Sequence, residues 1–364
     1  MNARDTRFMR LALSLGRRGL GNVWPNPAVG CVIVKNGRIL GRGWTQPGGR
    51  PHAEIHALNA VGADAQGADV YVTLEPCAHT GKTPPCADAL INAKIARLVV
   101  ASRDPDPRVD GQGLARIAAA GIPTIDAVLS GEANRDHQGF FTRIRQGRPM
   151  VTLKLATSFD GRIAMASGES RWITGPAARR QVHLLRSNHD AVMIGGGTAR
   201  ADDPILDVRD FGMVRQPVRV VLSRGLDLPI SGRLAASIAH APLWLLHGPG
   251  ADMGLISAWQ GMGARLFQVP LKAGHLDLNA AMQALGAAGL TRVFSEGGGA
   301  VAAGLIGAGL VDRLVGFTAG LALGADGRAA IGGLGMVKLA QAPRFTLRET
   351  RQVGVDVMHV WTPS

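Results

Sequence analysis

The sequence of 364 residues suggests two domains, each long enough to bury a core of its own, and its 18% charged and 46% apolar residues exclude a disordered chain. The formal net charge of +13 is spread over both halves, and aromatic side chains for stacking on bases are few. An anionic small molecule explains this charge as well as a polynucleotide does, so we expect a small-molecule partner and no nucleic acid.

The N-terminal stretch "MNARDTRFMRLALSLGRRGLG" has a helical pattern, with Phe8, Leu11 and Leu15 on one side. It has no apolar region followed by a small-residue cleavage site, and no apolar run in the chain is long enough to span a bilayer. We therefore expect a cytoplasmic protein with no membrane contact. Two apolar runs then flank Asn36-Gly37, which is typical of a type I′ hairpin and places Cys31 in a buried strand as an inert thiol.

The next stretch, "RPHAEIHALNA", places His52 and Glu54 two residues apart at the start of a predicted helix. Residues with this spacing point to nearly opposite sides of a helix, so the two side chains converge only at its end. Pro51 suits the first turn, and an apolar stripe at helical spacing follows it, consisting of Ile55, Leu58 and Val61. A simpler interpretation is a capping histidine and an acid that complements the helix dipole.

The two remaining cysteines lie in "VYVTLEPCAHTGKTPPCADALINAKI", where residues 70–74 are predicted to form a strand. Cys77 and Cys86 each follow a proline at a turn toward a helix, and a helix N-terminus favours the thiolate that a metal requires. One imidazole and two thiolates are typical of a catalytic zinc site with an open fourth position. Glu54 would then carry protons between water activated by the metal and a leaving amine.

The combined pattern "HAE" and "TLEPCAHTGKTPPC" resembles the riboflavin-pathway pyrimidine deaminases. Zinc deaminases in general carry H-x-E followed by P-C-x-x-C, whereas eight residues separate Cys77 from Cys86 in this chain. The resemblance implies that His52, Cys77 and Cys86 bind zinc and that Glu54 is the catalytic acid and base.

Further resemblance in "PNPAVGCVIV" and "GKTPPC" implies that Asn26 and Lys82 line the substrate site, with His79 as a neighbour that contacts substrate or orients the loop. Asn26 has the alternative role of a turn residue, and Lys82 that of a solvated loop charge. Many members of the family carry a histidine where this chain has Thr45, so a substrate contact there is lost or replaced.

A domain boundary is predicted near residue 147, giving a zinc-dependent deaminase domain over 1–147, as the resemblance implies, and a second domain over 148–364. Beyond it, strand-like runs such as "VTLKLA", "DAVMIG", "VRVVLS" and "PLWLLH" alternate with helical patterns such as "GPAARRQVHLLRS". This alternation predicts a largely parallel α/β sheet. The glycine-rich turns "MIGGGTARADDP" and "FSEGGGAVAAGLI" lack the spacing of the dinucleotide fingerprint.

The stretch from "KLATSFDGRIAMASGESRWITG" to "GGGTARADDPILDVR" resembles the reductase domain that is joined to the same deaminase in the bifunctional riboflavin enzymes, a relative of dihydrofolate reductase. The resemblance implies NADPH contacts from Ala156, Trp172, Thr198, Asp202, Ser223, Gly297, Gly298 and Gly299. It also implies substrate contacts from Ser170, Arg186, Leu206, Arg209 and Glu296. Lys154, on a predicted strand, reaches the substrate phosphate or extends along the surface.

These resemblances imply a cytidine-deaminase-like α/β/α domain followed by a dihydrofolate-reductase-like α/β domain. The expected reactions are zinc-dependent deamination of a phosphoribosylated diamino-pyrimidinone, then NADPH reduction of its ribosyl side chain. We also expect a homo-oligomer, either a dimer or a tetramer. The alternatives are a tRNA or free-base deaminase with an accessory domain, and a structural zinc module in a binding protein.

Overall fold

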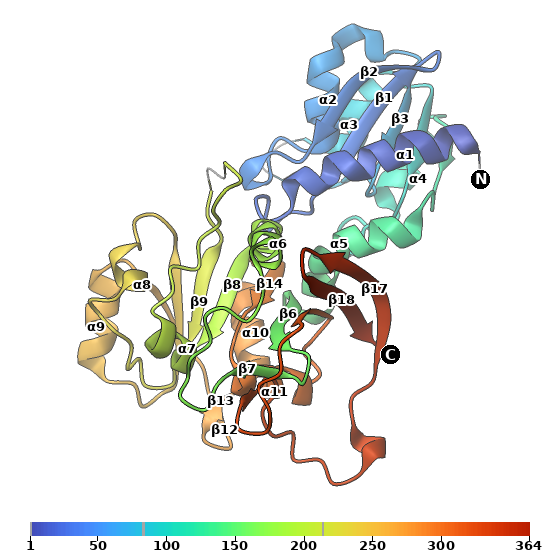
Figure 1. Ribbon diagram of the computed structural model, residues 1–364. Coiled ribbons are helices and arrows are strands. Elements are labelled where there is room, and N and C mark those ends of the chain that lie inside the picture. Colours follow the sequence, from blue (N-terminus) through green and yellow to red (C-terminus); the bar gives the residue numbers. More distant parts are fainter. Residues whose placement is uncertain (1, 82–83, 213–214) are drawn as a thin grey trace. The chain divides into compact units, whose positions relative to one another are not determined.

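The computed structural model describes residues 2–81, 84–212 and 215–364. The chain divides into two compact units, Met1–Gly147 and Arg148–Ser364. Each unit combines helices with a central sheet, so the predicted mixed α/β class is confirmed (Figure 1).

The first unit contains a five-stranded sheet in the order β2-β1-β3-β4-β5, in which β1 is antiparallel to its neighbours and β3, β4 and β5 are parallel. Its strands are β1 (Gly30–Lys35), β2 (Arg38–Trp44), β3 (Asp69–Val72), β4 (Arg97–Val100) and β5 (Thr124–Ile125). Its helices are α1 (Ala3–Gly16), α2 (Ala53–Val61), α3 (Cys86–Asn92), α4 (Gln112–Ala119) and α5 (Ser130–Gln146), with short 3-10 turns η1 (Arg17–Gly19), η2 (Pro47–Gly49) and η3 (Gly62–Ala65).

The N-terminal helix and the first hairpin are confirmed. Asn2 caps α1 by accepting a hydrogen bond from the backbone N–H of Arg4 at 3.0 Å. The hairpin turns at Asn36 and Gly37, whose φ angles of 51° and 78° are those of a type I′ turn. Cys31 is fully buried in β1, as predicted. The strand predicted over 70–74 ends earlier, since β3 ends at Val72.

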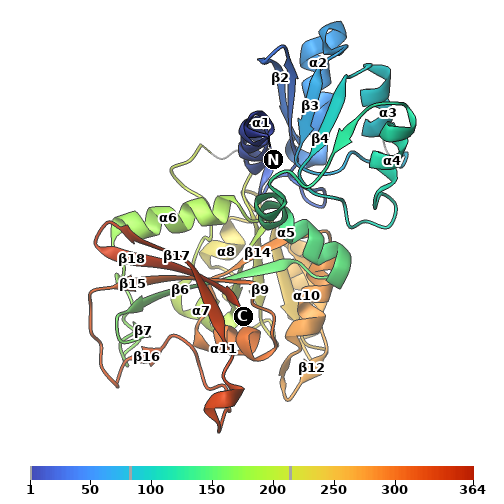
Figure 2. The ribbon, with the colours of Figure 1, turned by 90° about the vertical axis from the view of Figure 1, so that its right-hand side faces the viewer.

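Helices cover both faces of this sheet (Figure 2). One face packs on α1 through a cluster that includes Phe8, Leu13, Val32, Val34 and Tyr71. The other face packs on α2, α3 and α4 through a cluster that includes Ala57, Val70, Leu90, Leu98 and Ile117. The ends of β3 and β4 therefore emerge between two helical layers.

The predicted apolar stripe of α2 is wrong in detail. Its fully buried side chains are those of Ala53 and Ala57, while Leu58 and Val61 pack at the margin of the core and are only half-buried. The reason is the close approach of β2, where a Cβ atom on Gly43 would lie 2.1 Å from the carbonyl oxygen of Ala53. Small side chains on both elements hold the start of α2 against the sheet.

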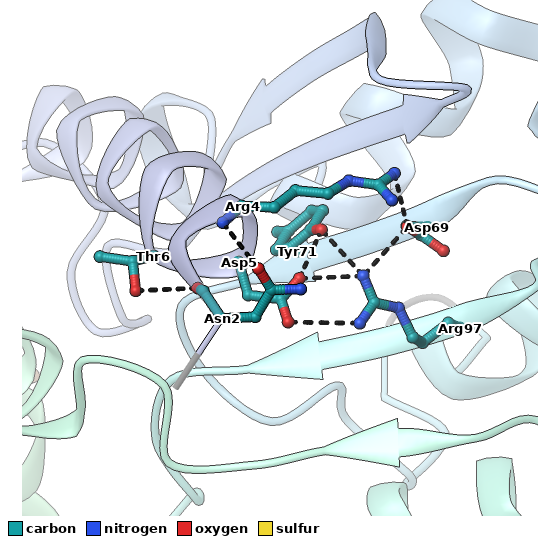
Figure 3. A network of polar contacts seen from close by, with 7 residues as sticks. All are labelled: Asn2, Arg4, Asp5, Thr6, Asp69, Tyr71 and Arg97. Carbon is teal, nitrogen blue, oxygen red and sulfur yellow. Dashed lines mark hydrogen bonds and ion pairs between the residues drawn. The ribbon is translucent and has the colours of Figure 1, made fainter.

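A buried polar network joins α1 to the central strands (Figure 3). The Asp5 carboxylate accepts hydrogen bonds from the Tyr71 hydroxyl at 2.8 Å and from the Arg97 guanidinium at 2.9 Å. Arg97 also pairs with Asp69 at 3.0 Å, and Arg4 reaches the same Asp69 oxygen at 3.0 Å. Burial raises the pKa of Asp5, but the hydrogen bonds from Arg97 and Tyr71 outweigh it and hold this pKa below its ordinary value.

We expect Asp5→Asn to lower the free energy of unfolding of the first unit by about 2 kcal/mol, because Arg97 and the Tyr71 hydroxyl lose a charged partner. The folded-state pKa of Asp5 is depressed, so this stabilisation is present above the ordinary Asp pKa and is lost as the pH falls through the folded value.

Native-state hydrogen exchange of the β3 amides measures the loss of stability in Asp5→Asn relative to wild type, at neutral pH and at pH about 3. Asp126→Asn, which removes the exposed partner of Arg103, is the control. An equal loss at both pH values contradicts the role of the charge.

The second unit is built on a nine-stranded sheet in the order β11-β10-β9-β8-β14-β6-β15-β18-β17. Its strands are β6 (Met150–Ser158), β8 (Ala191–Gly195), β9 (Val218–Leu222), β10 (Leu243–His247), β11 (Arg265–Gln268), β14 (Arg292–Ser295), β15 (Arg313–Ala319), β17 (Phe345–Val353) and β18 (Asp356–Pro363). Short strands outside it are β7 (Arg162–Ala164), β12 (Leu271–Lys272), β13 (His275–Leu276) and β16 (Arg328–Ala329). The helices are α6 (Pro176–Ser187), α7 (Gly196–Asp202), α8 (Arg233–Ala236), α9 (Met253–Gly261), α10 (Leu278–Ala287) and α11 (Gly299–Gly307), with a 3-10 turn η4 (Leu339–Gln341).

The predicted parallel sheet is confirmed from β11 to β15, where every neighbouring pair is parallel. The antiparallel hairpin β17–β18 at its edge was not predicted. Buried residues of α6 pack on Phe294, Val315 and Phe317, and Figure 2 shows α10 on the opposite side of the sheet. Among residues 2–81, 84–212 and 215–364, no helix combines the length and apolar character needed to cross a membrane.

Candidate active sites

The first unit brings His52, Cys77 and Cys86 together. Nδ1 of His52 lies 3.8 Å from the Cys77 sulfur and 3.4 Å from the Cys86 sulfur, and the three ligand atoms all lie within 4.8 Å of one another. His52 is the N-cap of α2 and Glu54 lies in its first turn, so both project from a helix end. Pro51 precedes the cap instead of occupying the first turn.

The two thiols reach this place in different ways. Cys86 is the first residue of α3, as predicted. Cys77 lies in a loop instead of at the start of a helix, and there the prediction is wrong. Its sulfur nevertheless accepts a hydrogen bond from the backbone N–H of Cys86 at 3.3 Å, so the N-terminus of α3 supports the Cys77 thiolate. The hydrogen bond with Cys77, followed by burial, instead raises the pKa of Cys86 well above its ordinary value, contrary to the prediction for this thiol.

The site has the electrostatics of an acid-base centre. The hydrogen bond with the Cys86 thiol, assisted by His52 and the Cys86 N–H, lowers the pKa of Cys77 to about 4 against the opposing effect of burial. Burial raises the pKa of Glu54 to about 7, although the neighbouring His52 opposes this rise. Glu54 is 4% exposed and interacts with the Cys86 thiol. A carboxyl group with a pKa near neutrality both accepts and donates protons at the working pH.

This donor set fits zinc. An imidazole nitrogen and two sulfurs, one held as thiolate, are the ligands that zinc prefers, and three protein ligands leave one position for a reacting group. A fourth histidine, cysteine or acidic side chain does not join the cluster among the described residues. That observation is contrary to a structural site, which is closed by four protein ligands.

Two of the predicted substrate residues contact or belong to the segments that carry the metal ligands. The Asn26 amide donates a hydrogen bond to the carbonyl oxygen of Gly49 at 2.8 Å, which fixes its orientation just before the helix that carries His52. His79 is half-buried, and its Nδ1 atom has no hydrogen-bond partner among the described residues. Lys82 lies outside the described residues. Thr45 is buried and accepts a hydrogen bond from the N–H of Val29 at 3.0 Å, so its side chain is occupied within the fold.

Two charged residues that were not predicted, Asp104 and Arg50, interact electrostatically with the metal ligands Cys77 and His52. Asp104 follows β4 and is buried, and burial raises its pKa to about 7 against the opposing hydrogen bond from the Asp106 N–H, with the charges of Asp106, Glu75 and Cys77 adding to the rise. Arg50 and His79 both lie close to Gly81, since a Cβ atom added there would be 3.4 Å from the Arg50 guanidinium and 3.9 Å from the His79 ring. The signal for Asp104 was available, because carboxyl ends of neighbouring parallel strands such as β3 and β4 meet at one sheet edge.

The second unit brings Lys154, Arg186 and Glu296 together. Arg186 forms a bidentate pair with the Glu296 carboxylate at 2.5 and 3.2 Å, and Nζ of Lys154 lies 3.8 Å from the same carboxylate. Burial lowers the pKa of Lys154 although Glu296 opposes this effect, whereas Arg186 and Lys154 hold the pKa of Glu296 below its usual value against burial. Two cations share one carboxylate, so the cluster has an excess positive charge that suits an anionic ligand.

The other predicted substrate residues are more dispersed. Arg209 is largely exposed, and its backbone N–H and guanidinium lie 3.3 Å and 3.5 Å from the two ring nitrogens of His183. The Leu206 side chain is 4% exposed within the core, and its φ is 60°, so any contact of this residue with a ligand comes from its backbone. Ser170 is half-buried in the loop before α6.

The predicted cofactor residues gather at one edge of the sheet. Ala156 is near the end of β6, Thr198 follows β8, Ser223 follows β9, and the turn that contains Gly298 follows β14. These four strands are parallel neighbours, and the carboxyl edge of such a sheet is where open α/β folds bind ligands. Thr198 lies beside the Gly298 turn, since a Cβ atom added to Gly298 would be 3.4 Å from Oγ1 of Thr198.

The remaining cofactor predictions have mixed surroundings. Trp172 is 69% exposed, and the Arg179 guanidinium lies 4.4 Å from its ring centroid. Asp202 is the last residue of α7 and is exposed. Neither Gly297 nor Gly299 has room for a side chain, because a Cβ atom would meet the Val301 side chain at Gly297 and the carbonyl oxygen of Ala329 at Gly299. Gly197 has no heavy atom within 4 Å of its Cβ position. Together with Gly298 it leaves backbone that a cofactor phosphate can approach, so the edge fits a dinucleotide.

Comparisons with known families match both units. Residues 2–102 match the cytidine and deoxycytidylate deaminase zinc-binding region, and residues 149–359 match the RibD C-terminal domain. The riboflavin biosynthesis protein RibD of Escherichia coli is 43% identical over 358 residues, which cover 97% of this chain and 98% of that protein. RibD of Haemophilus influenzae is 40% identical, covering 100% of this chain and 98% of the relative.

Solved structures agree with these matches over the whole chain. The structure of Acinetobacter baumannii RibD, form 1, is 36% identical with a TM-score of 0.89, covering 99% of both chains. A Thermotoga maritima structure, described as a diaminohydroxyphosphoribosylaminopyrimidine deaminase/5-amino-6-(5-phosphoribosylamino)uracil reductase, is 31% identical with a TM-score of 0.87, again covering 99% of both chains.

Proposed function

This chain belongs to the RibD family of bifunctional riboflavin-biosynthesis deaminase/reductases, and from that premise we propose how its two units divide the reactions. Its cofactors are zinc and NADPH. Residues 1–147 form the deaminase domain, and residues 148–364 form the reductase domain. The convergence of His52, Cys77 and Cys86 around the end of the helix that carries Glu54 is the observation that supports this proposal most directly.

The first reaction is hydrolytic deamination of 2,5-diamino-6-(5-phosphoribosylamino)pyrimidin-4(3H)-one, in keeping with the activity named for the Thermotoga relative. His52, Cys77 and Cys86 hold zinc, which when bound lowers the pKa of a water molecule toward neutrality. Glu54 takes a proton from the attacking water and delivers it to the departing amine nitrogen. Asn26, His79 and Lys82 bind and orient the pyrimidine and its phosphate.

The second reaction reduces the ribosyl side chain of the aminouracil to ribityl, giving 5-amino-6-(5-phosphoribitylamino)uracil, with NADPH as the source of hydride. Lys154, Arg186, Arg209 and Glu296 bind the phosphorylated side chain, together with Ser170 and the backbone of Leu206. The excess positive charge beside Glu296 supports an anionic substrate there.

NADPH is bound along the carboxyl edge of the parallel sheet. Thr198 and Asp202 on α7, Ser223 after β9 and the Gly297–Gly299 turn contact it from the strand ends. Ala156 and Trp172 also contact the cofactor. Support comes from the approachable backbone at Gly298 and Gly197.

The same proposal includes a small-molecule substrate without nucleic acid, a cytoplasmic location and a homo-oligomeric state, which stay predictions. The alternative of a tRNA or free-base deaminase with an accessory domain loses its basis, because residues 149–359 match the RibD C-terminal domain.

Metal removal tests the division of labour. Protein treated with a chelator is expected to lose NADPH oxidation with the diamino-pyrimidinone phosphate and to keep it with the aminouracil phosphate, since only the first reaction uses zinc. The absorbance of NADPH follows both reactions in wild-type protein, and added zinc is the control for recovery. Oxidation with neither substrate before chelation overturns the reductase assignment. Retained deamination after complete metal removal overturns the zinc site.

A further inference from the structure

Glu75 is a buried acid that takes no part in the reactions above. It is 3% exposed and stands two residues before Cys77. One carboxylate oxygen accepts hydrogen bonds from the backbone N–H groups of Asp104 at 3.3 Å and Gly111 at 3.1 Å. The other accepts from Gly113 at 2.9 Å and Leu114 at 3.2 Å. Four backbone donors from one distant segment therefore converge on a single side chain.

The start of α4 also packs closely against the Glu75–Pro76 backbone, in addition to its hydrogen bonds with the Glu75 carboxylate. A Cβ atom on Gly113 would lie 2.0 Å from the carbonyl oxygen of Pro76 and 3.3 Å from Cγ of Glu75. Only glycine allows α4 to approach Pro76 in this way. The N-terminus of α4 is thus seated on the residue that directly precedes the Cys77 ligand.

Cys77 needs such support because it lies outside any helix or strand. Its carbonyl oxygen accepts from the N–H of Ala87 at 3.2 Å, and its sulfur accepts from the N–H of Cys86. Both bonds come from α3, on one side of the loop. The bonds of Glu75 attach the loop to the start of α4, and the same carboxylate accepts from the backbone N–H of Asp104.

We propose that Glu75 is a positioning residue of the deaminase metal site, which fixes the Pro76–Cys77 loop and the Asp104 backbone so that the ligand set is preformed for zinc. The proposal rests on the deaminase function proposed above. Groups behind metal ligands commonly change metal affinity and activity when they are replaced, because the ligands lose their fixed orientation. A residue that only caps α4 would change stability and leave the metal unaffected.

Glu75→Gln and Gly113→Ala perturb this contact from its two sides. Glutamine keeps the shape of the side chain but removes its charge and turns an NH₂ group toward backbone donors. The methyl group of Gly113→Ala meets the Pro76 carbonyl. Gly131→Ala in α5 is the matched control, because its nearest neighbour, an Arg135 nitrogen, is 3.8 Å from the Cβ position.

The full-length variants are compared for zinc affinity, by competition with a chelating dye, and for the thiolate-to-metal absorption band after cobalt substitution. We expect zinc affinity to fall by about 10- to 100-fold in Glu75→Gln and Gly113→Ala, with an altered cobalt band and a lower deaminase kcat. Native-state hydrogen exchange of the β3 amides shows whether the first unit is folded in each variant, since reduction of supplied aminouracil reports only on the second unit. If Gly113→Ala fails to fold, Glu75→Gln decides alone.

Wild-type zinc affinity and an unchanged cobalt band in Glu75→Gln overturn the proposal, even if the variant unfolds at lower urea concentration, since that outcome describes a helix cap alone. The metal measurements involve no substrate. If wild type binds zinc and deaminates nothing, the proposed function fails while the role of Glu75 is still decided.

Discussion

Glu54→Gln is expected to reduce deamination of the diamino-pyrimidinone phosphate by about 10²- to 10⁴-fold, because the amide carries no proton between water and the leaving amine. The residue is buried beside the Cys86 thiol, and its pKa near 7 suits both halves of that transfer. The measurement is ammonia release by purified protein. Reduction of supplied aminouracil phosphate should continue at the wild-type rate, because that reaction belongs to the second unit.

Asp64→Asn supplies the control, since it neutralises an exposed acid of the same unit. Zinc content is measured in parallel, which separates a lost proton carrier from a lost metal. Ammonia release by metal-loaded Glu54→Gln at the wild-type rate contradicts the acid-base role.

Lys154→Met is expected to lower kcat/KM for the aminouracil phosphate by about 10²-fold, in line with the loss of a charged hydrogen bond worth about 1.5–3 kcal/mol. Lys154 is half-buried on β6 beside Glu296, and methionine retains much of its volume. Without the lysine, Arg186 and Glu296 neutralise each other and the excess positive charge disappears. The KM for NADPH should stay unchanged.

Steady-state NADPH oxidation at varied concentrations of each substrate measures this effect. Lys338→Met, an exposed position of the same unit, is the control, and ammonia release from the diamino substrate reports on the first unit. A rise in the KM for NADPH with an unchanged KM for the aminouracil would move Lys154 from the substrate to the cofactor.

Local sequence signals predicted a large part of this molecule. The Asn36-Gly37 turn, the first helix and the strand-helix alternation of the second half depend on neighbours in sequence, and the structure confirms them. His52 and Glu54 were identified together because two residues so spaced can cooperate only at a helix end, and they do lie at the start of α2. Their catalytic roles stay predictions until the variants are measured.

Other features depend on contacts between residues distant in sequence. The core face of α2 is made of alanines because β2 presents glycine to it, which no periodicity within the helix indicates. The thiol of Cys77 owes its environment to the N–H of Cys86, and the bond exists because the loop folds back on α3. The edge hairpin β17–β18 escaped prediction because β17 is exposed almost throughout and has no alternating apolar face.

Ligand types, helix ends and turn residues are set by a few neighbouring side chains, so the chemical groups of this protein can be identified from its amino-acid sequence. Which of those groups come into contact depends on how the helices and strands pack. Lys154, Arg186 and Glu296 come from β6, α6 and the end of β14, and the Glu75 carboxylate gathers donors from beyond β4. These side-chain contacts follow from the order of the strands and from the close packing of helices on the sheet. The free energy of that packing comes from many residues that lie far apart along the chain.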